Sequence, residues 1–275
     1  MTVRPPEHER RLIDNRNGVS PAVDGEASHK PWSVDVASSV GPSAGRVALV
    51  SGGNRGLGLQ LVRALVDVGM QVVMASRSVE NGYAAIELLG DRANQVAVLQ
   101  LDITNPASVG RVASWLRLRL GRCDVLVNNA AILIDDDDDA LAIDLDVVWR
   151  TLETNLLGSW RLSQAIAPMM RDHRYGRIVN VSSRLASLNS MQRGLAAYRV
   201  SKCGINALTR MLADELAGDR ILVNACCPGP VHVEDAASGS LPRLSASPDT
   251  PVWLATLPDG GPTGGFFCER QRVSW

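Results

Sequence analysis

Two patterns of apolar residues alternate along the chain from about residue 46 onward. Short, nearly continuous apolar runs, of the kind that form buried parallel strands, cover residues 46–50, 71–76, 95–102, 123–130, 176–183, 220–229 and 264–268. The longer segments between them have apolar positions every three or four residues, which predicts helices over residues 57–69, 79–90, 106–120, 140–172 and 196–217. This alternation is typical of an α/β fold with a doubly wound parallel sheet. We therefore predict a mainly parallel sheet of about seven strands with helices on both faces, the last strand lying at the sheet edge.

Residues 1–44 show neither pattern. They are rich in proline, glycine, serine and charged residues, a composition typical of segments that cannot bury a core. We expect a flexible N-terminal extension over residues 1–44 and a single domain over residues 45–275.

Charge and apolar content exclude several kinds of partner. The net charge is -1 at pH 7, so there is no electrostatic reason to expect nucleic acid or an anionic membrane. No apolar run approaches the roughly 20 residues that span a bilayer, and the first 18 residues lack the apolar core of a signal peptide. We expect a cytoplasmic protein that acts on a small molecule; a homo-oligomer is compatible with the sequence.

Cysteine, histidine and acidic residues give little indication of a metal site. The five cysteines form no CxxC pair and the four histidines lack metal-ligand spacing. The acidic run Asp135–Asp139 can be interpreted as a metal site or as a solvated loop, and we favour the loop because five like charges repel one another. Since the run follows a predicted strand, a minor role at the mouth of a pocket is the remaining alternative.

A glycine-rich turn joins the first predicted strand to the first predicted helix. Its sequence is SGGNRGLG, with Gly52, Gly56 and Gly58 in the spacing GxxxGxG. Glycines allow a tight turn there, let backbone N–H groups approach a pyrophosphate, and let the helix pack closely on the strand. In an alternating strand–helix chain, this position predicts a dinucleotide site.

The end of the second predicted strand indicates which dinucleotide binds. An NAD site usually places Asp or Glu there for the ribose hydroxyls, whereas an arginine can pair with the 2′-phosphate of NADP. This strand ends in Ala75-Ser76-Arg77, and Arg55 lies inside the glycine turn. Either arginine alone is compatible with a solvated surface charge. Together, and without the acid, they predict NADP(H).

The stretch YRVSK places Tyr198 and Lys202 on the same face of a predicted helix. That spacing is common in amphipathic helices, so by itself it favours ordinary packing. Its context changes the interpretation, because SGGNRGLG, LDIT, NNAA, TNLLG, NVSS, YRVSK and NACCPGPV follow one another in the chain. From Gly45 to Trp275 this series resembles the short-chain dehydrogenase/reductase family, which implies a Rossmann-fold domain.

The resemblance implies a set of cofactor contacts. Asp102 would bind the adenine amino group, and Asn128 would brace the fourth strand beside the cofactor. The full implied set is Gly52, Asn54, Arg55, Gly56, Leu57, Gly58, Arg77, Asp102, Ile103, Asn128, Ala130, Tyr198, Lys202, Pro228, Gly229 and Val231.

The resemblance also implies a catalytic group of Asn155, Ser183, Tyr198 and Lys202. Tyr198 would protonate the carbonyl oxygen, and Ser183 would hydrogen-bond that oxygen and polarise the bond. A free tyrosine has a pKa of about 10, so the Lys202 ammonium would stabilise the phenolate and lower that pKa. Lys202 would also hold the nicotinamide ribose, and Asn155 would hold a water linking Lys202 to solvent. Ser182 would point into the structure.

Within the family the chain looks most like NADPH-dependent carbonyl reductases, on the evidence of NACCPG and the tail TPVWLATLPDGGPTGGFF. The implied activity is reduction of a ketone, aldehyde or quinone. Two alternatives use the same residues or some of them: an NADP-binding redox sensor without turnover, and an NADP-dependent dehydrogenase of secondary alcohols. The chain departs from the family at Val233, which stands where a threonine usually binds the nicotinamide amide.

Overall fold

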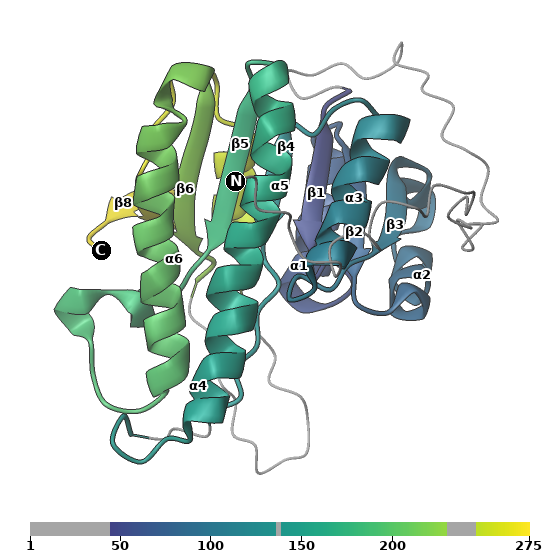
Figure 1. Ribbon diagram of the computed structural model, residues 1–275. Helices are drawn as coiled ribbons and strands as arrows, with labels where there is room; N and C mark the ends of the chain where they lie inside the picture. Colours follow the sequence, from purple (N-terminus) through teal and green to yellow (C-terminus); the bar gives the residue numbers. More distant parts are fainter. Residues whose placement is uncertain (1–44, 136–138, 230–245) are drawn as a thin grey trace, which may run out of the picture. The chain divides into compact units, whose positions relative to one another are not determined.

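The predicted strands form one sheet in the computed structural model, which describes residues 45–135, 139–229 and 246–275 (Figure 1). The strands in these residues are β1 (Val47–Ser51), β2 (Gln71–Ser76), β3 (Val96–Gln100), β4 (Val125–Asn128), β5 (Gly176–Val181), β6 (Ile221–Cys227), β7 (Phe266–Cys268) and β8 (Gln271–Val273). Their order across the sheet is β3-β2-β1-β4-β5-β6-β7-β8. Neighbours are parallel except β7 and β8, which are antiparallel.

The mainly parallel α/β fold is thus confirmed, with one correction at the edge of the sheet. β7 was predicted to be the edge strand, but β8 lies outside it. β8 has only three residues, of which Gln271 and Arg272 are exposed, so it carries no apolar run by which the sequence could reveal it. β1, β4, β5 and β6 are buried along their whole length, which explains why their runs were clear.

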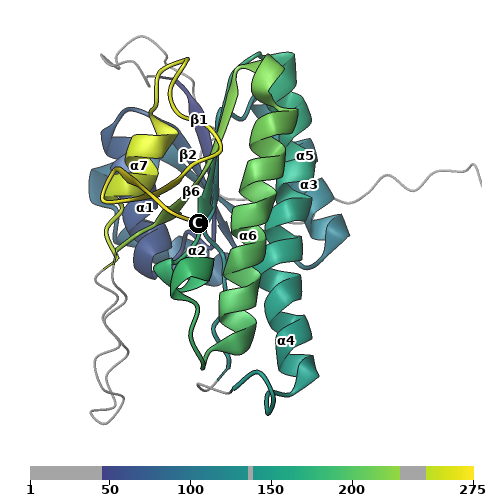
Figure 2. The same ribbon diagram turned by 90° about the vertical axis from the view of Figure 1, so that its left-hand side faces the viewer.

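Helices cover both faces of the sheet (Figure 2). In the described residues they are α1 (Gly56–Asp67), α2 (Val79–Glu87), α3 (Pro106–Arg119), α4 (Leu145–Leu152), α5 (Ser159–Asp172), α6 (Ala196–Glu215) and α7 (Asp249–Ala255). Helices α1, α2 and α7 lie on one face, and α3, α5 and α6 lie on the other. None of these helices is long and apolar enough to cross a membrane.

Two helix predictions need correction. The single helix predicted over residues 140–172 is two helices, α4 and α5, joined by a π-helical segment, Glu153–Gly158. Helix α7 was not predicted, because seven residues are too few for apolar periodicity to be seen. Its Leu254 and Ala255 are buried against the sheet, and its Trp253 meets Phe267 of β7 edge to face.

The sheet order also locates the crevice where a ligand fits. From β1 the chain proceeds outward to β2 and β3, then returns to pair β4 with the other side of β1. In open parallel sheets, ligands bind outside the carboxyl ends of the strands at such a reversal. The glycine turn follows β1, the NNAA segment follows β4, and Ser183 follows β5. The predicted flexible extension, residues 1–44, lies outside the described residues, as do Val231 and Val233.

Candidate active site

The glycine-rich turn between β1 and α1 has the backbone that its composition predicts. Gly52 and Gly56 have φ values of 64° and 52°, in the left-handed region that favours glycine. A Cβ added to Gly58 would lie 2.0 Å from the Gly52 carbonyl oxygen, whereas one added to Gly56 would meet nothing within 4 Å. The turn therefore needs glycine for close packing at Gly58 and leaves open space beside Gly56. Asn54 is partly buried and Leu57 is buried.

Arg55 and Arg77 lie at the ends of neighbouring parallel strands. Arg55 immediately precedes α1, and Arg77 immediately follows β2. Both are exposed, and neither guanidinium has a hydrogen-bond or ion-pair partner in the described part of the chain. The acid nearest to them in sequence, Glu80, is occupied: Ser78 donates a hydrogen bond of 2.7 Å to it. Two uncompensated positive charges therefore remain at this end of the sheet.

Asn129, which sequence reasoning missed, fixes the glycine turn to the end of β4. Its side-chain amide donates to the carbonyl oxygens of Ser51 and Gly52, at 2.9 and 3.2 Å. The backbone N–H groups of Asn129 and Ala130 donate in turn to the Ser51 hydroxyl, both at 3.0 Å. The second asparagine of NNAA was the available signal, since it directly follows a buried strand next to β1.

Asn128, by contrast, points into the sheet. Its amide nitrogen donates to Asn180 Oδ1 at 2.8 Å and to Ser163 Oγ at 3.0 Å. It therefore braces β4 against β5 and α5, as the resemblance implied. Its own Oδ1 is buried and has no hydrogen-bond partner within the described residues. Ser182 is also turned inward, as predicted: it is buried and donates to Asn206 Oδ1 at 2.7 Å.

The remaining predicted cofactor contacts lie at the same sheet edge. Asp102 follows β3, and its Oδ1 accepts hydrogen bonds from the N–H and the hydroxyl of Thr104. Ile103 is buried against Gly158, where an added Cβ would lie 2.7 Å from it. Pro228 and Gly229 follow β6, and Gly229 has a φ of 108°.

Ser183, Tyr198 and Lys202 converge at this edge. The Ser183 hydroxyl lies near the Tyr198 phenol, close enough to act to lower its pKa. The Lys202 ammonium lies 5.7 Å from the centroid of the Tyr198 ring and donates to the Val181 carbonyl oxygen at 2.8 Å. Lys202 is 3% exposed. The three side chains thus come from the end of β5 and one turn of α6.

Burial shifts the pKa values of Tyr198 and Lys202, and the shift of Tyr198 is opposite to the one expected from the sequence. Burial raises the pKa of Tyr198 to about 12, although the nearby Ser183 hydroxyl opposes that rise. Burial lowers the pKa of Lys202 to about 8, because the ammonium loses its hydration. The expected lowering of the pKa of Tyr198 by Lys202 is therefore not found. With this pKa, the Tyr198 phenol keeps its proton at neutral pH.

Asn155 links three segments and lies in the π-helical segment, not in a regular helix. Its Oδ1 accepts from the Ile132 N–H at 2.8 Å, and its amide donates to the Ile132 carbonyl oxygen and to Ser201 Oγ. Ser201 Oγ donates onward to the Tyr198 carbonyl oxygen at 2.7 Å. Both amide hydrogens are used by protein atoms, so the side chain has none to give to a water. The water-holding role remains a prediction for its oxygens.

The interpretation of Asp135–Asp139 as a solvated loop is wrong for Asp135. Asp135 is only 1% exposed, and its Oδ2 accepts the Tyr198 N–H at 3.0 Å. Asp139 is paired with Arg193. Residues 136–138 lie outside the described residues. A run of five identical residues contains no local signal that distinguishes the first from the rest. Asp135 is buried because of the path that the loop takes to α6.

Lysine usage is a second signal that the sequence analysis missed. The chain has two lysines, Lys30 and Lys202, whereas all its other basic residues apart from histidine are arginines. Arginine remains charged at any physiological pH, whereas a buried lysine readily changes its pKa. A chain that uses arginine almost everywhere yet has lysine at residue 202 suggests that this position needs lysine chemistry.

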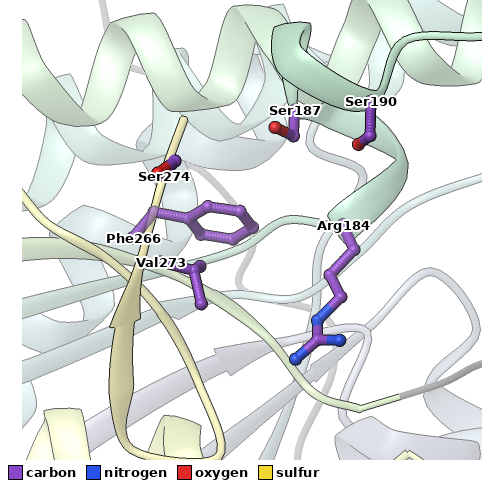
Figure 3. A pocket seen from close by; sticks show the side chains of 6 residues that line it. All are labelled: Arg184, Ser187, Ser190, Phe266, Val273 and Ser274. Atoms are coloured by element: carbon purple, nitrogen blue, oxygen red, sulfur yellow. The ribbon is translucent and has the colours of Figure 1, made fainter.

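A cavity of about 200 Å³ adjoins the segment that follows Ser183 (Figure 3). Arg184, Ser187 and Ser190 line it from that segment, and Phe266, Val273 and Ser274 line it from β7 and the end of β8. Tyr198 and Lys202 are not among the lining residues. The cavity is therefore a neighbour of the predicted catalytic group and does not contain it.

Comparison with known proteins identifies the family. A family model described as short chain dehydrogenase matches residues 46–240. Carbonyl reductase (NADPH) 3 of Homo sapiens is 33% identical over 279 residues, covering 85% of this chain and 99% of the relative. Carbonyl reductase (NADPH) 1 of Mus musculus is 32% identical over 277 residues, covering 83% and 98%.

Solved structures lead to the same family. A metagenomic short-chain oxidoreductase in complex with NADP has a TM-score of 0.69 and 29% identity, covering 80% of this chain and 95% of that chain. A putative short-chain alcohol dehydrogenase from Sinorhizobium meliloti 1021 has a TM-score of 0.71 and 27% identity, covering 82% and 94%. With a family model that matches most of its length and relatives more than 30% identical, this chain belongs to the short-chain dehydrogenase family.

Proposed function

We propose that the protein is an NADPH-dependent reductase of ketones, aldehydes or quinones in which Tyr198 protonates the carbonyl oxygen. The observation that carries the proposal is the meeting of Ser183, Tyr198 and Lys202 at the carboxyl edge of the sheet, beside the glycine turn. The relatives named as NADPH carbonyl reductases support the same reaction class.

The residues at the sheet reversal fit a phosphorylated dinucleotide. The open space beside Gly56 gives a pyrophosphate access to the backbone at the start of α1. Arg55 and Arg77 are exposed and have no partner in the described part of the chain, so they offer their guanidinium groups to a 2′-phosphate. Asp102 keeps Oδ2 outside the turn formed with Thr104, since only Oδ1 takes part in that turn. This oxygen would accept a hydrogen bond from the adenine amino group.

A bound nicotinamide cofactor supplies the hydride, so this chain must orient the carbonyl group and deliver a proton. With its pKa raised to about 12, the Tyr198 phenol is protonated at neutral pH and can donate to the carbonyl oxygen. The Ser183 hydroxyl, which lies near that phenol, would bind the same oxygen and stabilise its developing negative charge. Both groups therefore act on one oxygen atom.

Lys202 would lower the free-energy cost of removing that proton from the Tyr198 phenol. A phenolate would be costly to bury in this site, and an ammonium one helical turn further along α6 would stabilise it as it forms. The ammonium is within 5.7 Å of the ring centroid and is fixed by Val181. With a pKa of about 8, Lys202 can also pass a proton toward the phenolate near neutral pH, which is the range where a proton relay works best.

Removal of one oxygen atom tests the role of Tyr198. We expect the parent protein to oxidise NADPH in the presence of some of a panel of ketones, aldehydes and quinones, and Tyr198→Phe to be slower by roughly 10²–10⁴-fold. NADPH binding, measured by fluorescence, should survive, because the implied phosphate contacts lie at β1 and β2.

Tyr175→Phe is the matched control. It removes the same atom just before β5, at the amino end of the strand whose carboxyl end leads to Ser183, and should leave turnover unchanged. Full activity of Tyr198→Phe would exclude the proposed acid. A parent protein that binds NADPH but turns over none of the panel would favour the redox sensor, and NADP-dependent oxidation of secondary alcohols alone would favour the dehydrogenase.

A further inference from the structure

The first turn of α6, which carries Tyr198, is held by a residue from a distant part of the chain. The residue before the helix, Leu195, has a φ of 51° and provides no side-chain cap. The N–H groups of a helix's first turn have no partner inside the helix and need one from elsewhere. For Tyr198, the third residue of α6, that partner is Asp135 Oδ2 at 3.0 Å. An N-cap is thus supplied by the loop after β4.

The burial of Asp135 requires a physical reason, because a buried carboxylate is costly unless it is paired. No ion pair or side-chain donor to this carboxylate is found among the described residues. The compensating interaction is the amino end of α6, a helix of 20 residues whose dipole favours a negative charge at that end. The other oxygen, Oδ1, is buried and without a hydrogen-bond partner in the described residues. At Oδ1, therefore, no hydrogen-bond donor among the described residues screens the negative charge of Asp135.

The loop that carries Asp135 is itself fixed at two other points. Asn129 binds the glycine turn, and Ile132 is bonded through both its backbone groups to Asn155. Residues 129–135 thus connect the end of β1, the π-helical segment and the start of α6. Asp135 is the last of these contacts and the one that reaches the backbone of Tyr198.

We infer that Asp135 is a positioning residue for Tyr198: its carboxylate holds the first turn of α6 in place and contributes a negative charge to the electrostatic field at the phenol. The inference rests on the proposed role of Tyr198 as the acid. The charged and titrating groups that face the phenol are Lys202 from α6, Cys227 from β6 and Asp135 from the loop. Cys227 and Asp135 are the two acidic groups among them, and of these only Asp135 also accepts a hydrogen bond from the Tyr198 backbone.

Two substitutions separate the hydrogen bond from the charge. Asp135→Asn keeps an oxygen that can accept the Tyr198 N–H but removes the negative charge. Asp135→Leu removes both at similar volume. Asp139→Asn is the matched control, because Asp139 belongs to the same acidic run but is bonded to Arg193. Each protein is studied at full length and with NADPH bound.

Hydrogen exchange of the Tyr198 amide tests the hydrogen bond. We expect exchange at least about tenfold faster in Asp135→Leu, as for loss of a helix cap, and unchanged exchange in Asp135→Asn and Asp139→Asn. Carbonyl turnover should fall at least about tenfold in Asp135→Leu, because a small displacement of the acid is costly, with NADPH affinity unchanged. Unchanged exchange in a folded Asp135→Leu protein would overturn the inference.

The pH dependence of turnover tests the charge. The negative charge of Asp135 contributes to raising the pKa of Tyr198, so its removal should lower that pKa and deprotonate the acid sooner as pH rises. The ratio of Asp135→Asn turnover to parent turnover should therefore be constant near neutral pH and fall as pH approaches the Tyr198 pKa of about 12, while the Asp139→Asn ratio stays constant throughout. A constant ratio for Asp135→Asn would overturn the electrostatic part. If the parent shows no carbonyl turnover, the proposed function fails, but amide exchange still decides whether Asp135 holds α6.

Discussion

Replacement of Lys202 by methionine should make the protein more stable at neutral pH while it abolishes most turnover. Lys202 is 3% exposed, and burial lowers its pKa from 10.5 to about 8. At about 1.4 kcal/mol for each pKa unit, the charged side chain costs the folded state about 3 kcal/mol at pH 7. Methionine has similar length and no charge, so it removes this cost.

Part of that gain is offset by a lost hydrogen bond. The ammonium donates to the Val181 carbonyl oxygen at 2.8 Å, and leaving a buried carbonyl without a donor costs about 1–2 kcal/mol. The net gain for Lys202→Met is therefore about 1–2 kcal/mol at pH 7. For a domain of this size, about 2–4 °C of melting temperature per kcal/mol is expected, so the protein should melt about 2–8 °C higher.

The pH dependence has a defined sign. Because the folded pKa of Lys202 lies below the unfolded one, the unfolded chain binds the extra proton between about pH 8 and 10.5. The parent therefore gains stability across that window, whereas Lys202→Met does not. The difference between their melting temperatures should shrink as pH rises and reverse sign by about pH 10, where the lost hydrogen bond outweighs the remaining charge cost. Below about pH 8 both states are protonated and the full difference remains.

Thermal melts of both proteins at several pH values provide the assay, with Lys202→Arg as a control that keeps the charge. The two lysines of the chain would give two side-chain signals in a lysine-labelled NMR sample, and the signal lost in Lys202→Met reports the pKa of Lys202 directly. A variant that melts at or below the parent at pH 7, or one that still melts above the parent at pH 10, would refute the reasoning.

Two further predictions concern the cofactor site. NADPH should bind more tightly than NADH by about 1.5–3 kcal/mol, as for charge-assisted hydrogen bonds to a phosphate, and Arg77→Asp should erase or reverse this preference, while Arg111→Asp on α3 should keep it; equal affinities in the parent would contradict the assignment. Gly58→Ala should weaken NADPH binding, because its Cβ would lie 2.0 Å from the Gly52 carbonyl oxygen, whereas Gly110→Ala, with nothing within 4 Å, should stabilise α3 by about 0.5–1 kcal/mol. Calorimetric titration with each cofactor and thermal melts measure both effects, and normal NADPH affinity in a folded Gly58→Ala protein would show that the turn can shift at no cost.

The parts of the fold that the sequence predicted are those in which local pattern and burial agree. β4 and β5 are buried on both faces, so each appears as a continuous apolar run bounded by polar residues. β8 has three residues and two of them are exposed, and it exists because β7 offers it a free edge. No local signal records such a pairing, since its energy comes from strand contacts elsewhere in the chain.

The candidate site likewise contains residues that the sequence could place and residues that it could not. Tyr198 and Lys202 could be placed because one helical turn fixes their relation, and the glycine turn because its backbone needs residues without a Cβ. The partners of Asn155 and Asp135 could not, because both depend on where the loop after β4 runs. The pKa of Tyr198 was misjudged for a related reason. The sequence reveals that a cation is near but not how deeply the phenol is buried, and here burial has the larger effect.

The contacts around Tyr198 hold its turn rigid while they leave free the phenol that we propose as the acid. Asp135 bonds its N–H, and Ser201, which is held by Asn155, bonds its carbonyl oxygen. Both restraints act on the backbone, so neither consumes the proton that the phenol would donate. A general acid is effective only if it is well placed and its proton is available. Backbone restraint from two separate segments, which leaves the phenol itself unrestrained, satisfies both conditions at once.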